Sequence, residues 1–259
     1  MPSIIAIPAF NDNYIWLIRE RAFAAVVDPG DAAPVQKYLA REGLSLAAIV
    51  TTHHHADHVG GNRALLARQA VPVFAPARET IPGATRPLAQ GDRIEVPGIG
   101  VTLDVLDVPG HTAGHIAYVG DIDGPVLFCG DTLFAAGCGR LFEGTPAQMW
   151  TSLSKFARLD PATRVYCAHE YTLANLSFAA AVEPANAAIR ARIAGATGQR
   201  ARDVPTLPST IGLELATNPF LRVREPSVRD AAEAHAETRL ADDVDVFAAL
   251  REWKNGFRS

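Results

Sequence analysis

Histidine and aspartate residues with the types and spacing of metal ligands are the most informative feature of this sequence. Residues 53–58 contain four histidines and one aspartate, half of the chain's 8 histidines. His111, Asp131 and His169 each directly follow an apolar segment or its turn. Imidazole and carboxylate groups bind first-row metals without needing a reducing compartment. Together these residues favour a metal centre over the alternative, in which each is an isolated surface or turn residue.

The spacing predicts two ions rather than one. His53 and His55 alternate along an extended loop, so their side chains lie on one side and can chelate one ion. Asp57 and His58 stand at the turn into a helix and suit a second ion. The candidate ligands are seven: His53, His55, Asp57, His58, His111, Asp131 and His169. A single site with three protein ligands would leave four of them without a role, whereas two sites that share a carboxylate use all seven. Asp131 is the expected bridge, in a centre whose ions lie roughly 3.5–4 Å apart around a hydroxide with a pKa of about 7.

Short strands and helices are expected to position these ligands. Apolar segments bounded by Pro and Gly predict strands over 3–8, 14–18, 24–28, 46–52, 71–74, 93–96, 101–107, 115–119, 125–129 and 164–167. Apolar residues at helical spacing predict helices over 34–41, 62–69 and 146–159. The first strands follow one another closely, which favours antiparallel pairing. The ligands therefore lie in loops after strands, where α/β proteins usually carry their chemistry.

The pattern changes near residue 170, where we expect a domain boundary. Beyond it the sequence predicts helices over 174–182, 184–194, 227–238 and 242–253, with residues 195–208 as a loop. The expected fold class is therefore layered α/β with an added α-helical domain.

Composition limits the classes of partner. The chain has 259 residues, 48% hydrophobic and 20% charged, with a formal net charge of −4. This balance favours a small anionic substrate over nucleic acid. No apolar run approaches the roughly 18 residues that span a bilayer, and no signal segment is evident, so we expect a cytoplasmic protein without a membrane partner. Three widely spaced cysteines are expected to be free thiols.

Four residues near the motifs keep two interpretations. Asp28 is either a turn residue or a carboxylate that orients a metal-bound histidine. His54 has no place among the ligands and is expected to support them from behind or to face solvent. His115 is expected to be packed or to support a ligand. Cys138 could line a pocket, although a small buried thiol is the favoured role.

The motifs resemble those of the metallo-β-lactamase superfamily and, within it, the hydroxyacylglutathione hydrolase (glyoxalase II) family. The superfamily resemblance rests on residues 53–58, 110–112 and 130–132 and on His169. The family resemblance rests on the blocks 51–61, 137–145, 167–176 and 217–222, of which the last two discriminate best. It implies a four-layer αββα sandwich with a C-terminal α-helical domain. Residues 1–170 would form the catalytic domain and residues 171–259 the glutathione-binding domain.

The resemblance also assigns roles to individual residues. It implies one ion held by His53, His55 and His111 and another held by Asp57, His58 and His169, with Asp131 bridging. It places glutathione contacts at Arg140, Phe142, Tyr171, Arg251 and Lys254. Residue type alone favours a solvated basic face for the C-terminal cations, and the resemblance reverses that preference. The family often has Lys and Tyr where this chain has Arg140 and Phe142, so the charge is kept and the phenol is lost.

The implied activity is hydrolysis of S-D-lactoylglutathione and related 2-hydroxyacylglutathiones to the hydroxy acid and glutathione, as in methylglyoxal detoxification. A metal-bridging hydroxide would attack the thioester, with Asp57 and Asp131 as the carboxylates of the centre. Two divalent ions are expected, zinc first and iron or manganese as alternatives, in a monomer. The rival enzymes are a glutathione persulfide dioxygenase-like or a lactonase-like member of the superfamily. A non-catalytic metal-binding scaffold is the rival outside enzymes.

Overall fold

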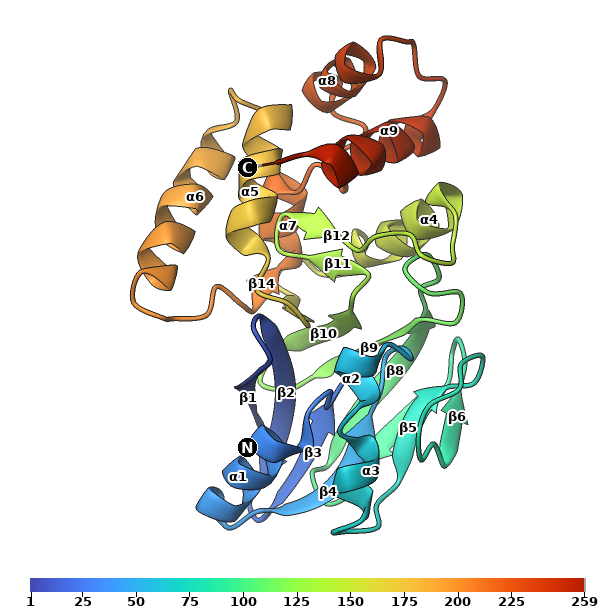
Figure 1. Cartoon of the computed structure of the whole chain (residues 1–259), viewed down its shortest axis with the longest axis vertical. Helices are drawn as coiled ribbons and strands as arrows, with labels where there is room; N and C mark the ends of the chain where they lie inside the picture. The colour runs from blue at the N-terminus through green and yellow to red at the C-terminus, as the bar shows by residue number, and fades with distance from the viewer. Residues whose placement is uncertain (259) are drawn as a thin grey trace.

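Two six-stranded sheets face each other at the centre of the protein, as seen in a computed structural model that describes residues 1–258 (Figure 1). The first sheet has the order β1 (Ser3–Ala9), β2 (Asn13–Glu20), β3 (Phe23–Val27), β4 (Ser45–Val50), β5 (Val73–Pro76), β6 (Arg86–Leu88). The second has the order β14 (Ser209–Thr210), β13 (Arg164–Cys167), β10 (Pro125–Gly130), β9 (Ile116–Asp121), β8 (Val101–Asp107), β7 (Arg93–Val96). Ser259, the last residue of the expected helical domain, lies outside the described residues.

The first sheet begins with the predicted antiparallel strands and continues with parallel ones. β1, β2 and β3 pair antiparallel, and β3 to β6 pair parallel. The helices α1 (Ala32–Glu42), α2 (Ala56–Val59) and α3 (Asn62–Leu66) follow β3 and β4. Val35 of α1 and Leu65 of α3 are buried together with Leu17 and Val26 of the sheet. These helices therefore cover the outer face of the first sheet.

The larger core lies between the sheets and under α4 (Pro146–Phe156). Trp16 of the first sheet meets the ring of Tyr166 of the second edge-on at 4.9 Å. Met149 and Phe156 of α4 are fully buried, and the Thr145 side chain caps the helix. Helix, sheet, sheet and helix thus succeed one another in the expected αββα order.

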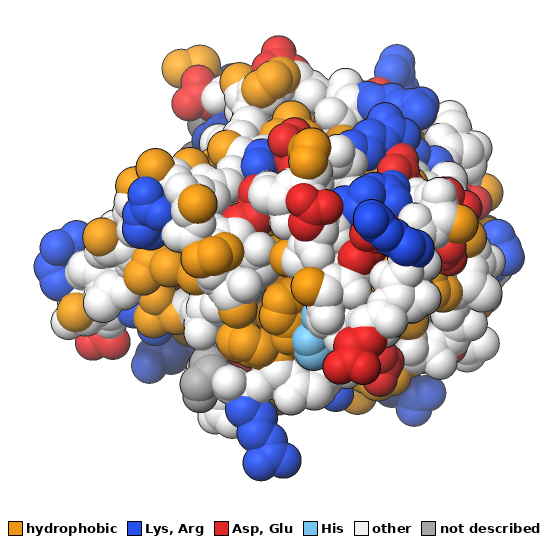
Figure 2. Space-filling model, turned by 90° about the horizontal axis from the view of Figure 1, so that it is seen from above, with side chains coloured by type: hydrophobic (Ala, Val, Ile, Leu, Met, Phe, Trp, Pro, Cys, Tyr) orange, Lys and Arg blue, Asp and Glu red, His pale blue; other side chains and the backbone are white. Residues whose placement is uncertain are grey.

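The C-terminal part of the chain is mostly helical and lies over one end of the sandwich (Figure 1). Its helices are α5 (Thr172–Val182), α6 (Ala187–Arg200), α7 (Ile211–Thr217), α8 (Pro226–Ala236) and α9 (Asp243–Gly256). Seen from that end, acidic and basic side chains both occur on the surface, with basic side chains more frequent toward the upper right and hydrophobic ones toward the centre left (Figure 2). Among residues 1–258, no helix is long and apolar enough to cross a membrane.

Three expectations about this region were wrong. Residues 195–200 belong to α6 rather than to a loop, since Ile189 and Ala196 pack in a small core and outweigh the helix cost of about 1 kcal/mol for each glycine. The same helix begins at Ala187 rather than at Pro184, because the Asn186 side chain caps it. The strand over 164–167 is not the last, as the two-residue β14 pairs with it and leads into α7.

Candidate metal centre

The seven predicted ligands converge at one end of the sandwich, beneath the helical region. They follow β4, β10 and β13 or lie in the loop between β8 and β9. Within each of two triplets the ligand atoms lie within 4.8 Å of one another: His53, His55 and His111 form one, and Asp57, His58 and His169 form the other. A third group within the same distance joins His53 and His58 with Asp28. The first two triplets are the ligand sets that the family resemblance implies for the two ions.

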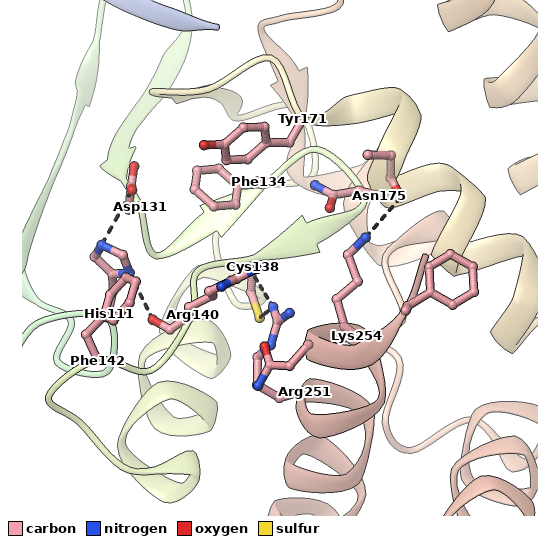
Figure 3. A pocket seen from close by; sticks show the side chains of 13 residues that line it. His111, Asp131, Phe134, Cys138, Arg140, Phe142, Tyr171, Asn175, Arg251 and Lys254 are labelled. Atoms are coloured by element: carbon pink, nitrogen blue, oxygen red, sulfur yellow. Dashed lines mark hydrogen bonds and ion pairs between the residues drawn. The ribbon is translucent and has the colours of Figure 1, made fainter. Parts of the chain in front are cut away.

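Asp131 lies between the two triplets and presents one oxygen to each side. Its Oδ1 is 3.4 Å from Nε2 of His58 and 3.4 Å from Nε2 of His169. Its Oδ2 is 3.4 Å from Nε2 of His111 in the other triplet (Figure 3). A carboxylate with this orientation can share two cations.

Buried polar atoms without partners test whether the residues fit a metal. Of the six side-chain atoms that are buried without a hydrogen-bond partner among the described residues, three are Nε2 of His53, Nε2 of His58 and Oδ1 of Asp131. Burying such atoms unpaired is costly, and native proteins avoid it. All three belong to the two triplets or the carboxylate between them. The donor set of imidazole nitrogens and carboxylate oxygens therefore fits divalent cations.

Asp28 orients two of the histidines from behind. Its Oδ2 lies 3.1 Å from Nδ1 of His58 and accepts the hydroxyl hydrogen of Thr52 at 2.6 Å. The Thr52 hydroxyl lies 3.1 Å from Nδ1 of His53. A partner at Nδ1 leaves Nε2 free as the ligand atom, so this network fixes the tautomer that metal binding needs. Of the two interpretations of Asp28, the orienting carboxylate is the one the contacts support.

Two further partners hold His169 and His111. Nδ1 of His169 lies 2.8 Å from Oδ1 of Asp12, and Nδ1 of His111 lies 2.9 Å from the carbonyl oxygen of Arg140. Asn13 donates to Oδ2 of Asp57 at 3.0 Å. The sequence interpretation missed Asp12, which lies in the turn between β1 and β2, and Asn13, which begins β2. Their only signal was a pair of short polar residues, which turns contain routinely.

The predicted ligands differ in their protonation states. Burial and the neighbouring His58 hold the pKa of His53 well below its ordinary value, and burial also lowers the pKa of His111. Burial alone would raise the pKa of Asp131, but His58 and His169 outweigh it and keep that carboxyl ionised. Burial lowers the pKa of His169 less than Asp131 and Asp57 raise it, so its pKa reaches about 10. Metal binding must therefore displace protons.

A pocket of about 500 Å³ opens beside Asp131 and His111. The five residues predicted to contact glutathione all line it: Arg140, Phe142, Tyr171, Arg251 and Lys254. Tyr171 stacks on the His169 ring at 4.7 Å, which joins the pocket to the ligands. Phe142 is 63% exposed, so its ring forms part of the pocket mouth. Figure 3 shows Asp131 and His111 on one side of this cavity and Arg251 and Lys254 on the other, with Arg140 between them.

Backbone carbonyl oxygens hold both cations of α9. Arg251 is buried, donates to the carbonyl oxygen of Cys138 at 2.9 Å, and keeps a buried Nε without a partner. Lys254 donates to the carbonyl oxygen of Ala174 at 3.0 Å. Burial and the charges of Arg251 and Arg140 lower the pKa of Lys254 to about 8. Three cations line the pocket, and its one acidic lining residue, Asp131, lies at the metal-ligand end, so the part of the pocket lined by the cations favours an anionic ligand.

The other singled-out residues support the site from outside. His54 lies between Glu79, at 3.0 Å, and Glu143, at 3.3 Å. His115 is fully buried, and its Nε2 accepts from the backbone N–H of Asp131 at 3.2 Å. Cys138 is a buried free thiol that also lines the pocket, so both of its interpretations hold.

Known proteins resemble this chain over its whole length. The model of the metallo-beta-lactamase superfamily matches residues 9–169, and that of the hydroxyacylglutathione hydrolase C-terminus matches residues 170–257. A hydroxyacylglutathione hydrolase of Cupriavidus taiwanensis is 58% identical and covers 100% of both chains. Another, of Alkalilimnicola ehrlichii, is 59% identical and covers 98% of this chain and 99% of its own.

Solved structures share the fold. ETHE1 from Myxococcus xanthus has a TM-score of 0.64 at 23% identity and covers 98% of each chain. TTHA1623, in a di-iron-bound form, has a TM-score of 0.57 at 28% identity and covers 85% of this chain and 100% of its own. With two family models and full-length relatives in agreement, the chain belongs to the hydroxyacylglutathione hydrolase family of the metallo-beta-lactamase superfamily.

Proposed function

We propose that this protein hydrolyses 2-hydroxyacyl thioesters of glutathione, S-D-lactoylglutathione first among them, to the hydroxy acid and glutathione. The observation that carries the proposal is the adjacency of a two-triplet ligand cluster and a cationic pocket of about 500 Å³. The relatives named hydroxyacylglutathione hydrolase support the substrate class.

The chain's own residues would divide the work. We assign one cation to His53, His55 and His111 and the other to Asp57, His58 and His169, with Asp131 shared. Divalent ions held there supply a Lewis acid for the thioester carbonyl and lower the pKa of water toward neutrality. Asp57 is kept ionised because its hydrogen bond to His169 lowers its pKa. A thiolate is a tolerable leaving group, so no side chain is required to protonate it.

The pocket would bind the glutathione part of the substrate. Arg140, Arg251 and Lys254 offer guanidinium and ammonium donors to a carboxylate. Tyr171 and Phe142 supply flat apolar surface toward the metal ligands. We therefore propose that residues 1–170 carry the reacting centre and that residues 171–259 supply the grip on glutathione through Tyr171 and the two α9 cations.

Zinc is the metal we propose, because histidine and carboxylate ligands suit it. The di-iron form of TTHA1623 makes iron the first alternative, and manganese remains the second. The free buried thiols support a reducing, cytoplasmic setting, where glutathione is plentiful. We propose a monomer, since the pocket and ligands all come from one chain.

Thiol release tests the proposal directly. Purified, metal-replete protein should release free glutathione from S-D-lactoylglutathione, and the Asp131→Asn variant should lose at least about a hundredfold in kcat/KM. A protein that leaves this thioester intact while it cleaves a lactone would overturn the proposal. Oxygen uptake with glutathione persulfide would instead identify the dioxygenase-like alternative.

A further inference from the structure

A short hairpin connects the candidate metal centre with the pocket. The strands β11 (Leu133–Phe134) and β12 (Gly137–Cys138) pair antiparallel directly after Asp131 and lead into Arg140. The segment 131–140, which contains this hairpin, meets the ligands at both ends. Asp131 lies between the triplets, and the Arg140 carbonyl oxygen lies 2.9 Å from Nδ1 of His111. A displacement of the hairpin would therefore move a bridging ligand and the partner of another ligand together.

Side chains of the helical region hold the hairpin tip from the other side. Asn218, at the end of α7, donates to the carbonyl oxygens of Phe134 at 3.2 Å and Gly137 at 2.9 Å. The backbone N–H of Ala136 donates to Oε2 of Glu214 at 2.8 Å. Asn175 of α5 donates to the carbonyl oxygen of Ala135 at 3.1 Å. Four backbone polar groups of the hairpin thus form hydrogen bonds with three side chains of the helical region.

The hydrogen bonds that Asn175, Glu214 and Asn218 make to the hairpin form a clamp, and the side chains that make it are buried. Glu214 and Asn218 are 0% exposed, and Asn218 also donates to Oε2 of Glu214 at 3.0 Å. The second oxygen of Glu214 accepts from Arg192 at 2.5 Å. A carboxylate this deep persists only when it is paired and hydrogen-bonded, so its position is fixed by the structure around it. Ala136 has a positive φ of 55°, which indicates that the tip is held in a conformation it would not otherwise prefer.

The clamped hairpin shapes the pocket as well as the ligand loop. The Phe134 ring lies edge-on to His169 at 5.7 Å and to Tyr171 at 5.2 Å. The Cys138 carbonyl oxygen receives Arg251, and both Phe134 and Cys138 line the pocket. Glu214 and Asn218 do not line the pocket, and the hairpin is the element through which they contact its wall.

We infer that Asn218 and Glu214 are positioning residues that set the hairpin 133–138, and through it Asp131 and the pocket wall, for the reaction. The inference rests on the proposed function for its kinetic part only. It also gives a physical role to the block 217–222, which the metal chemistry leaves unused. The helical region would then contribute to the ligand loop as well as to the grip on substrate.

The test compares Asn218→Ala with Asn186→Ala. Asn186 is a matched control, since its side chain caps α6 and donates to the carbonyl oxygen of Ala216 without contacting the hairpin. We expect Asn218→Ala to speed amide hydrogen exchange over residues 133–140 by at least about tenfold. It should also lower kcat/KM for lactoylglutathione by about 10–100-fold, as losses of residues behind a ligand do. Asn186→Ala should leave both at wild-type values when compared at the same distance below the unfolding temperature.

Equal kinetic losses in the two variants, or unchanged exchange in the hairpin of Asn218→Ala, would overturn the inference. Should Asn218→Ala fail to fold, hydrogen exchange of the wild-type protein still tests the inference. The clamp predicts that the Ala136 amide exchanges as slowly as the amides of the core strands. Fast exchange of the Ala136 amide would contradict the inference. A wild-type protein inactive on thioesters would refute the proposed function. The exchange measurement would then continue to test the clamp separately.

Discussion

Lys254 should make glutathione binding depend on pH above neutrality. Burial and the cations of Arg251 and Arg140 lower its pKa to about 8 in the free protein. A bound carboxylate favours the charged lysine, so binding takes up a proton wherever the free lysine has lost one. The affinity must therefore fall as pH rises through 8. If only the charged form binds, the dissociation constant rises by a factor of 1 + 10^(pH − 8), which is about twofold at pH 8 and about elevenfold at pH 9.

The measurement is calorimetric titration of S-methylglutathione, whose thiol is blocked, from pH 6.5 to 9 at constant ionic strength. Lys254→Met keeps an unbranched chain and removes the charge. We expect it to weaken binding at pH 7 by about 10–100-fold, since hydrogen bonds to charged groups contribute roughly 1.5–3 kcal/mol. The slope between pH 7.5 and 9 should also disappear. An equal slope in Lys254→Met would assign the titration to the ligand's own amine and refute the reasoning.

Three further predictions concern the ligand support, the pocket mouth and the core. Asp28→Ala removes the partner of His58 and Thr52, so metal affinity measured by chelator competition should fall about 10–100-fold; unchanged affinity would deny the carboxylate its orienting role. Phe142→Tyr restores a phenol at the exposed mouth and should tighten S-methylglutathione binding about two- to tenfold, from a hydrogen bond of roughly 0.5–1.5 kcal/mol, whereas no gain would exclude that contact. Phe178→Ala empties a site packed against Phe220 and Trp253, and its free energy of unfolding in urea should fall by about 3–5 kcal/mol; a loss under 1 kcal/mol would contradict the described packing.

The ligands could be predicted from sequence because each follows a strand that local composition predicts. His53 to His58 come after the buried strand β4, and Asp131 and His169 after β10 and β13. Local pattern does not identify partners that come from far along the chain. Asp12 meets His169 across 157 residues, and nothing near either residue indicates the pairing.

The helical region shows the same limit. Short elements such as β14 and α7 contain too few residues to show a repeating pattern of apolar positions, so the sequence does not predict them. Gly195 and Gly198 reduce helix propensity, and only tertiary packing of Ile189 and Ala196 shows that α6 continues through them. No local pattern predicts that Glu214 and Asn218 are buried, and their contacts with the hairpin 133–138 are seen only in the fold.

Metal titration of the apoprotein tests the central claim most directly. Two ligand triplets that share Asp131 predict that thiol release from S-D-lactoylglutathione is absent without metal and rises until two equivalents of a divalent ion are bound per chain. Elemental analysis of the same samples gives the stoichiometry. Full activity in the metal-free protein, or a maximum at one equivalent with no second ion bound, would contradict the account.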